Sequence, residues 1–331
     1  MKKSLRILAL TLALLLTFAV AGCGSKAPAS SAAPSTDASA SGGEAAKELT
    51  ITLITMDSMD EHWLKVKKGA EDAAAELGNI KLNFDAPQTK VDATVQAQLV
   101  ENAITNKSDA IMLAPLDKEA LKPAVEKAKD AGIPVILIDS AVNTDKYDAF
   151  FSTNNAAAAE LAADKLAELV GKKGQIAVIN AQAGSATTMT REKAFTDKIA
   201  KDYPEMEVVG VQYSDGDKQK ALNYTTDFMT KYPDIVGFYA TNEGSTVGCA
   251  NAVDQAGKAD SVQVVGFDFS DDTKALIEKD IVKASMVQNP YVMGNEGLKA
   301  AVKIANGETV EPKDVDTGVT VATKENLSEI K

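Results

Sequence analysis

The sequence of 331 residues is poor in the residue types that build metal centres and catalytic sites. Two cysteines and a single histidine, His62, allow neither a cysteine cluster for zinc nor a histidine-rich metal site. The sequence has no glycine-rich dinucleotide motif, no phosphate-binding loop followed by lysine and no G-x-S-x-G motif. We therefore predict that the protein is not an enzyme and has no catalytic residue, metal or cofactor.

Positive charge is in deficit as well. The chain has 35 Lys and Arg against 47 Asp and Glu, which gives a formal net charge of −12. The first 22 residues hold three of the basic residues and no acid, so a chain without them is more acidic still. Because an acidic exterior repels phosphate groups, we exclude nucleic acid as a partner.

The beginning of the chain has the pattern of an export signal. Three basic residues among the first six precede the apolar run 7–20, which is short for a membrane-spanning helix. The small pair Ala21-Gly22 then offers a cleavage site. This order predicts a signal peptide over residues 1–22.

The sequence V-A-G-C at 20–23 resembles a bacterial lipobox. This resemblance implies cleavage before Cys23 and acylation of its sulfur; the alternative is an ordinary secretory signal with an incidental cysteine. Residues 23–47 are rich in Ser, Ala, Pro and Gly, a composition that predicts a disordered tether. We therefore expect a lipid anchor on the extracytoplasmic face of the cell membrane.

From Leu49 onward, short apolar runs alternate with amphipathic segments of helical period. Continuous runs rich in Val and Ile are typical of parallel strands that are covered on both faces. The predicted strands are 49–55, 80–84, 109–113, 134–138, 147–151, 175–180, 206–212, 235–239, 262–267 and 283–288. They are too many for one sheet in a chain of this size, so we predict two α/β lobes of about six strands each.

An acid follows a predicted strand in each half of the chain, Asp139 in the first and Asp268 in the second. In open parallel sheets, ligands bind beyond the carboxyl ends of the strands. The two acids therefore indicate a site between the lobes. The alternative is that each acid caps a following helix.

The chain from about residue 48 to 331 resembles the periplasmic binding proteins of the ribose and galactose type. The similar segments are T-I-T-L-I at 50–54, A-P-L-D at 114–117, A-G-I-P-V-I-L-I-D at 131–139, T-R-E-K-A-F at 190–195, A-T-N-E at 240–243 and V-V-G-F-D at 264–268. The resemblance implies two Rossmann-like lobes with parallel sheets, joined by a three-segment hinge. The implied crossings lie near 152–153, 287–289 and 313–315. The implied lobes are 48–152 plus 289–314 and 153–288 plus 315–331.

The resemblance also implies a set of ligand-binding residues: Asp60, His62, Trp63, Asp139, Arg191, Asn242, Asp268 and Gln288. Asp139 matches an acid that accepts hydrogen bonds from sugar hydroxyls, and Arg191 matches an arginine that donates to sugar oxygens. Asn242 and Asp268 match residues that bind hydroxyls, and Gln288 matches a hinge residue that touches the ligand. These side chains suit sugars because each sugar hydroxyl both donates and accepts hydrogen bonds. Carboxylates accept hydrogen bonds, amides donate and accept them, and the planar guanidinium of arginine donates several.

Asp60, His62 and Trp63 occupy a loop and first helical turn in which the family has a polar residue and aromatic rings. Trp63 could stack on a pyranose face or pack into the core of the first lobe. His62 could contact the ligand or be a structural or surface group. Arg191 could likewise form a surface ion pair with Glu192 or Asp197.

The sequence departs from the family at two positions. Ser140 follows the first-lobe acid where members often have arginine, and Gly216 stands where they have a second-lobe aromatic. One wall for stacking on the sugar is therefore missing or supplied from elsewhere. Asn154 and Asn155 are expected to cap the helix that follows them.

We expect a monomer that captures a neutral sugar, polyol or sugar-like ligand and docks on the membrane permease of an ABC-type importer. A cleft with Asp60, Asp139 and Asp268 against Arg191 repels phosphates and carboxylates and also admits a cation. Alternatives are a sugar receptor for a chemotaxis or sensor-kinase system and, with less support, an exported glycosidase.

Overall fold

The computed structural model describes residues 47–88 and 92–330. The predicted signal 1–22, Cys23 and all but the last residue of the predicted tether 23–47 lie outside the described residues. Among the residues that are described, none of the helices has the length and apolar character needed to cross a membrane.

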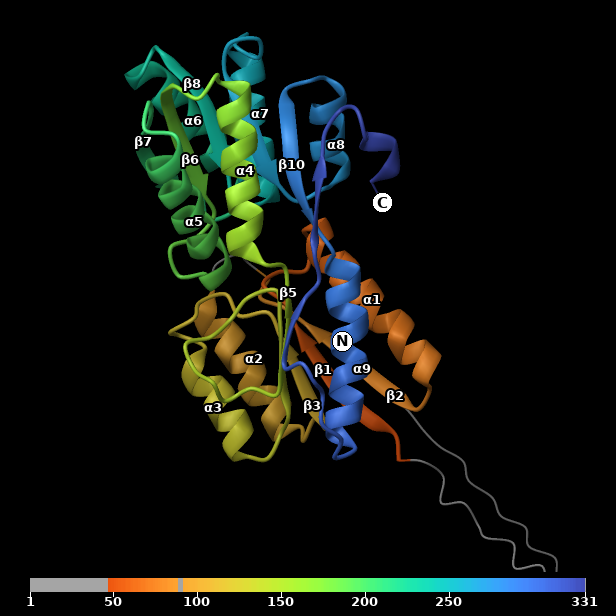
Figure 1. Cartoon of the computed structure of the whole chain (residues 1–331). Helices are drawn as coiled ribbons and strands as arrows, with labels where there is room; N and C mark the ends of the chain where they lie inside the picture. The colour runs from red at the N-terminus through yellow and green to blue at the C-terminus, as the bar shows by residue number, and fades with distance from the viewer. Residues whose placement is uncertain (1–46, 89–91, 331) are drawn as a thin grey trace, which may run out of the picture. The chain divides into compact units, whose positions relative to one another are not determined.

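The first lobe is built on a six-stranded sheet in the order β11-β5-β4-β3-β1-β2, with every neighbouring pair parallel. Helices α1 and α9 pack on one face of the sheet, and α2 and α3 pack on the other (Figure 1). The strands are β1 (Leu49–Ile54), β2 (Ile80–Asp85), β3 (Ala110–Leu113), β4 (Val135–Ile138), β5 (Ala149–Ser152) and β11 (Asp314–Asp316). The helices are α1 (Glu61–Leu77), α2 (Ala93–Thr105), α3 (Lys122–Asp130) and α9 (Pro290–Ala305).

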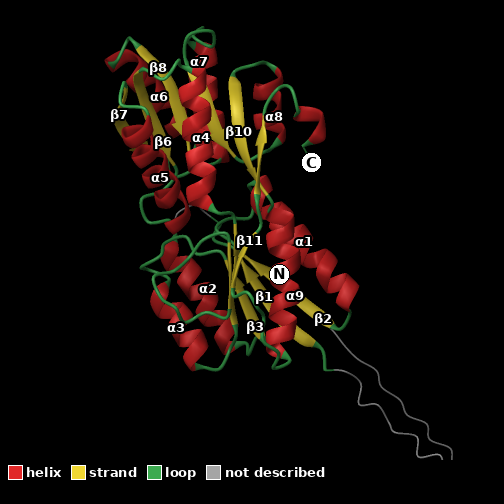
Figure 2. Cartoon of the chain, viewed as in Figure 1, coloured by secondary structure: helices red, strands yellow, loops and turns green. Residues whose placement is uncertain are grey.

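The second lobe has a sheet in the order β12-β10-β9-β8-β6-β7, in which only the β10–β12 pair is antiparallel. Helices α4 and α5 pack on one face, and α6, α7 and α8 on the other (Figure 2). The strands are β6 (Gly174–Asn180), β7 (Met206–Tyr213), β8 (Ile235–Ala240), β9 (Gln263–Phe267), β10 (Val282–Gln288) and β12 (Val319–Ala322). The helices are α4 (Asn155–Leu169), α5 (Ala186–Asp202), α6 (Lys218–Lys231), α7 (Glu243–Gln255), α8 (Asp271–Glu278) and the short η1 (Leu327–Glu329).

Apolar side chains of the central strands alternate between two cores in each lobe. In β3, Met112 packs with α1 and α9, whereas Ile111 and Leu113 pack with α2 and α3. Burial on both faces explains why these strands are continuous apolar runs in the sequence. The predicted fold class is therefore confirmed, and the ten predicted strands are β1–β10 with ends shifted by at most two residues.

Two glycines allow α1 and α9 to pack closely, although they lie more than 200 residues apart in the sequence. A Cβ at Gly69 would lie 2.1 Å from the carbonyl oxygen of Tyr291, and one at Gly294 would lie 1.9 Å from that of Val66. Any larger residue would push the helices apart. This contact holds α9, which follows the strands β6–β10 of the second lobe in the sequence, in the first lobe.

The chain crosses between the lobes at 153–154, at 289 and at 317–318. The third crossing comes later than the expected 313–315, because β11 still pairs with β5. Hydrogen bonds join the crossing segments: the Thr317 N–H donates to Ser152 O at 2.9 Å, and the Asn289 side chain donates to Thr317 O at 2.6 Å. Three adjacent, hydrogen-bonded segments form a hinge whose few residues can absorb a rotation.

Candidate functional site

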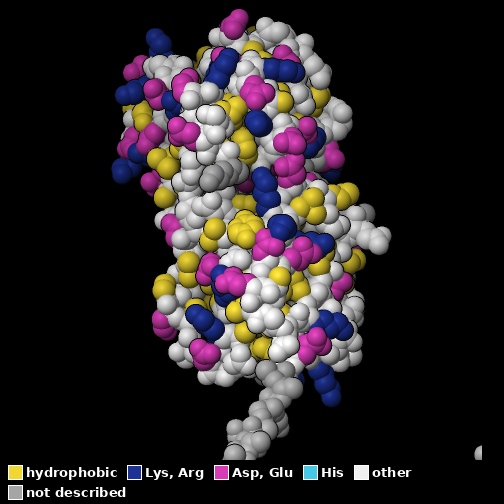
Figure 3. Space-filling view, turned by 90° about the vertical axis from the view of Figure 1, so that its right-hand side faces the viewer, with side chains coloured by type: hydrophobic (Ala, Val, Ile, Leu, Met, Phe, Trp, Pro, Cys, Tyr) yellow, Lys and Arg dark blue, Asp and Glu magenta, His cyan; other side chains and the backbone are white. Residues whose placement is uncertain are grey.

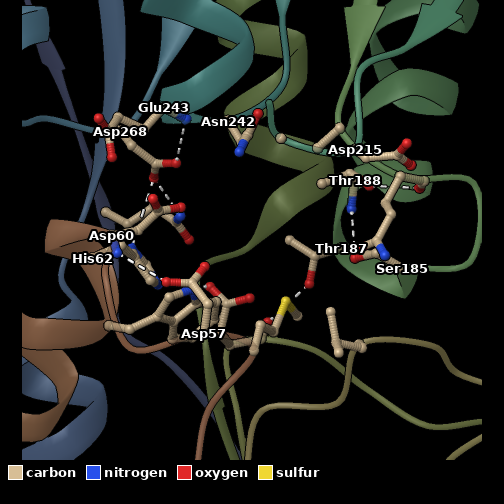
Figure 4. A pocket seen from close by; sticks show the side chains of 18 of the residues that line it. Asp57, Asp60, His62, Ser185, Thr187, Thr188, Asp215, Asn242, Glu243 and Asp268 are labelled. Atoms are coloured by element: carbon tan, nitrogen blue, oxygen red, sulfur yellow. Dashed lines mark hydrogen bonds and ion pairs between the residues drawn. The ribbon is translucent and has the colours of Figure 1, made fainter. Parts of the chain in front are cut away.

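A pocket lies beyond the carboxyl ends of strands from both sheets, with an empty volume of about 650 Å³ that includes open solvent at its mouth (Figure 4). All eight residues predicted from the sequence line it. Its other lining residues are not among the predicted ligand contacts: Met56, Asp57, Leu116, Ala181, Gln182, Ser185, Thr187, Thr188, Asp215, Gly216 and Glu243. The two sheets thus bring together side chains that are up to 232 positions apart.

The two strand-end acids occupy matching positions. Asp139 follows β4 and Asp268 follows β9, both with left-handed backbone, at φ values of 63° and 70°. The Asp139 N–H donates to Phe151 O at 2.8 Å, and the Asp268 N–H donates to Met286 O at 2.9 Å. Aspartate tolerates this conformation because its short polar side chain can form local hydrogen bonds. Each carboxylate is thereby fixed at the edge of its sheet and buried.

His62, in the first turn of α1, lies between the two acids. Its Nε2 is 3.1 Å from Oδ2 of Asp139, and its Nδ1 is 3.8 Å from Oδ1 of Asp268. Burial alone would lower the pKa of His62, but the close contact with the carboxylate of Asp139, together with the charge of Asp268, raises it above 6.5. His62 is therefore a buried group in the pocket wall and not a surface residue.

Trp63 has both of the roles that its sequence position allows. It lines the pocket, and it also packs in the core between β1 and α9 with only 6% of its surface exposed. The ring of His62 meets it edge-on at a centroid distance of 4.6 Å. The indole can therefore present a firmly held apolar face to a ligand.

Arg191 is the only arginine in the chain besides Arg6, and it is 2% exposed. Its Nε donates to Oδ1 of Asn155 and its Nη1 to Thr241 O, both at 2.8 Å. The guanidinium lies 3.6 Å from the ring centroid of Phe267, in cation–π contact. Nη2 is buried without a hydrogen-bond partner among the described residues. The surface ion-pair alternative is wrong.

The sequence did not indicate that Asn155 orients Arg191, because its position before a predicted helix suggests a helix cap. Only Asn154 caps α4, through a hydrogen bond from the Ala157 N–H at 3.2 Å. Asn155 is the first residue of α4, and it orients the guanidinium of Arg191. Only the tertiary placement of α5 against α4 distinguishes the two asparagines.

Asp268 is held by two groups of its own lobe. Its Oδ2 accepts from the Glu243 N–H at 3.0 Å, and its Oδ1 accepts from Nε2 of Gln288 at 2.6 Å. Oε1 of Gln288 is buried without a partner among the described residues. Ser270 caps α8, so the capping alternative for Asp268 is wrong. Asn242 caps α7 by accepting from the Ser245 N–H at 3.0 Å while it also lines the pocket.

Three further acids line the pocket. Oδ1 of Asp57 accepts from two backbone N–H groups, those of Met59 at 2.8 Å and Asp60 at 2.9 Å. Asp215 pairs with Lys220 at 2.7 Å, and Glu243 pairs with Lys218 at 3.1 Å. Burial and the charge of Asp60 raise the pKa of Glu243. On the molecular face shown in Figure 3, acidic and basic side chains are interspersed, whereas six acids in the pocket lining stand against Arg191 and His62.

The apolar part of the pocket lining comes mainly from the first lobe, through Met56, Trp63 and Leu116. In the second lobe, Gly216 has φ +68°, and a Cβ there would lie 3.2 Å from Nδ2 of Asn242. Among the described lining residues, the aromatic rings are those of His62 and Trp63, both from the first lobe. The aromatic missing at Gly216 is therefore not replaced by another second-lobe ring.

Comparisons with known proteins agree on one family. A family model described as "periplasmic binding protein domain" matches residues 51–309. The ribose import binding protein RbsB of Bacillus subtilis is 30% identical over 265 residues, which are 80% of this chain and 84% of that protein. A solved ABC transporter solute-binding protein from Agrobacterium vitis, with bound D-fucose, is 38% identical at a TM-score of 0.82, covering 85% of this chain and 97% of that one. A carbohydrate transporter solute-binding protein from Agrobacterium radiobacter, in complex with D-arabinose, is 33% identical at a TM-score of 0.83, with coverage of 86% and 97%.

Proposed function

We propose, from the premise that this chain belongs to the periplasmic binding protein family, that it captures a neutral sugar or sugar-like ligand for an ABC-type importer. At the coarser level, the chain is a sugar-binding protein of the ABC transporter type and not an enzyme. The eight predicted residues contact the ligand in this proposal, and the ligand carries no negative charge.

The observation that carries the proposal is that two buried polar atoms of the pocket lining, besides Nε2 of His62, have no hydrogen-bond partner among the described residues. Nη2 of Arg191 is a donor and Oε1 of Gln288 is an acceptor, and neither has a partner among the described residues. A buried polar group without a hydrogen bond costs about 1–3 kcal/mol. Because a sugar hydroxyl both donates and accepts, a sugar can satisfy both atoms.

The charges of the pocket favour a ligand without negative charge. Asp139 and Asp268 lie in the wall with four more acids, and the added carboxylate or phosphate of a charged sugar would be repelled at short range. Hydroxyl groups donate well to carboxylates, and such charge-assisted hydrogen bonds are stronger than neutral ones.

We infer that the lobes close around the ligand about the hinge at 153–154, 289 and 317–318. Direct contacts already join the lobes across the pocket. Oγ1 of Thr187 donates to Asp139 O at 3.1 Å, and the Lys118 N–H donates to Gly184 O at 3.1 Å. A ligand that touches both lobes stabilises the closed form by the contacts it makes only there.

For delivery, we propose a monomer anchored by lipid at Cys23 to the extracytoplasmic face of the cell membrane, beside its permease. The lipobox-like sequence and the Ser- and Ala-rich segment 23–47 support this proposal. Cys23→Ser should move the protein from the membrane fraction to the soluble extracytoplasmic fraction. A Cys23→Ser protein that stays fully membrane-bound would contradict the anchor.

The ligand class is tested by thermal unfolding of residues 47–331 with D-ribose, D-allose, D-arabinose and D-fucose, against glucose 6-phosphate and gluconate. A ligand that binds only the native state raises Tm by mass action. We expect at least one neutral sugar to raise Tm in a dose-dependent way and the two anions to leave it unchanged. A response to the anions alone would overturn the proposal.

A further inference from the structure

His62 is the only histidine of the chain, and it joins groups from both lobes. It belongs to α1 of the first lobe, as does its closer partner Asp139 at the end of β4. Asp268, 3.8 Å from Nδ1, belongs to the second lobe. The contact between His62 and Asp268 therefore depends on how far the lobes have closed (Figure 4).

We propose that protonated His62 is an ionic latch between the lobes, so that closure around the ligand is accompanied by uptake of a proton. The latch rests on the proposed function, because it acts on the closing of the two lobes around a sugar. His62 acts as a positioning residue here: it holds the carboxylates of Asp139 and Asp268 on opposite sides of one imidazolium.

The charged groups around His62 favour its protonated form. Two acids act on it directly, Asp139 after β4 and Asp268 after β9. Four more acids line the same pocket: Asp57, Asp60, Asp215 and Glu243. Two cations lie near it: Arg191 on α5 lines the same pocket, and its charge opposes protonation, and Lys65 on α1 lines an adjoining pocket together with His62. Burial opposes it too, yet the pKa of His62 lies above its ordinary value because Asp139 and Asp268 outweigh both.

The direction of the pH dependence follows from the contact with Asp268. When the lobes open, Asp268 moves away and its contribution to the raised pKa of His62 is lost. Opening also relieves the burial of His62 and removes the charge of Arg191, both of which lower the pKa of His62. The latch requires the contact with Asp268 to outweigh these two effects, so that the closed-form pKa exceeds the open-form pKa and closure takes up a proton at pH values between them. Sugar affinity should be full below the open-form pKa and fall by up to tenfold per pH unit as pH rises toward the closed-form pKa. Above the closed-form pKa it should reach a lower plateau.

A single histidine makes the latch directly measurable. In a protein without a polyhistidine tag, the imidazole signals in a ¹H–¹⁵N NMR titration belong to His62 alone. We expect the pKa of His62 to fall in Asp139→Asn and also in Asp268→Asn, with circular dichroism used to verify folding. The titration is made without ligand and again with saturating D-fucose, because Asp268 reaches His62 only in the closed form. In the sugar-bound protein, a pKa that falls in Asp139→Asn but is unchanged in Asp268→Asn would overturn the latch.

The second measurement adds D-fucose and follows affinity by calorimetry from pH 6 to pH 9. We expect proton uptake on binding, an affinity that decreases with pH, and a pH-independent, weaker affinity in His62→Gln. Equal pH profiles in the wild type and His62→Gln would overturn the latch while leaving sugar binding intact. If D-fucose and the other neutral sugars fail to bind at every pH, the proposed function fails and the latch fails with it, whereas sugar binding with equal pH profiles overturns the latch alone.

Discussion

The two lobes share one architecture but contribute different chemistry to the pocket. Each ends a central strand with an aspartate in left-handed backbone whose N–H donates to the adjacent strand. In the first lobe, Asp139 faces His62 and lies among the apolar side chains of the wall. In the second lobe, Asp268 is tied to Glu243 and Gln288, and Arg191 is tied to Asn155 and Thr241.

This difference suggests that the two lobes contribute to ligand binding in different ways, a proposed division between them. The second lobe holds donors and acceptors that its own hydrogen bonds fix before any ligand arrives, which lowers the entropy lost on binding. The first lobe supplies the ring of Trp63 and the carboxylate of Asp139, which has fewer contacts within its own lobe than Asp268 has in the second. We therefore expect mutations in the second lobe to affect both affinity and stability, and those in the first lobe to affect mainly affinity.

The largest effect should come from Arg191→Lys in the second lobe. A lysine cannot reproduce the hydrogen bonds to Asn155 and Thr241 O or the stacking on Phe267, and its charge would stay buried. We expect sugar affinity to fall by about 100-fold or more and the free energy of unfolding in urea to fall by about 2–4 kcal/mol. Calorimetry and urea titration measure the two effects.

The matched control for that substitution is Lys193→Ala on the same helix. Lys193 pairs with Asp197 at 2.6 Å, and both side chains are largely exposed. Surface pairs of this kind contribute little to stability. Affinity should be unchanged, and a loss in Lys193→Ala as large as that in Arg191→Lys would mean that any change in α5 disturbs the lobe.

The two strand-end acids give the most direct comparison of the lobes. Asp139→Asn and Asp268→Asn should each lower sugar affinity by roughly 10- to 100-fold, because a charge-assisted hydrogen bond becomes a neutral one. Asp268→Asn should lower the free energy of unfolding more, by about 1–3 kcal/mol, because Glu243 N–H or Gln288 Nε2 loses its acceptor, whereas in Asp139→Asn the loss is relieved when His62 releases its proton. Equal losses of stability in the two variants would contradict the proposed division.

A smaller effect should follow from Gly216→Ala, which tests why the second lobe has no aromatic wall. The residue has φ +68°, and its new Cβ would press on the amide of Asn242. We expect affinity to fall by less than tenfold and stability to fall by about 1–2 kcal/mol. Gly78→Ala is the control: it has the same φ but no atom within 4 Å of the new Cβ. It should show the same loss of stability and no loss of affinity.

The sequence predicts most of the strands of this molecule and some of the residues that line its pocket. Buried parallel strands are continuous apolar runs, so β1–β10 could be located, whereas β11 and β12 are three and four residues long with polar positions. Strand-end acids could be located because strand ends in a parallel sheet are binding positions. Glu243 and Asp57 were missed because an acid at a helix start or in a polar loop usually caps a helix or faces solvent.

The smallest effect should come from Lys65→Ala, which removes one contact between the lobes beside the pocket. Nζ of Lys65, on α1 of the first lobe, donates to Phe269 O of the second lobe at 3.0 Å. If this contact forms only on closure, its loss should weaken sugar binding about two- to threefold, as expected for one partly exposed hydrogen bond. Thermal unfolding without ligand should be unchanged. Lys68→Ala, one turn away and paired with Asp72 within the first lobe, should leave affinity unchanged. Equal affinity in all three proteins would mean that closure does not depend on this edge of the cleft.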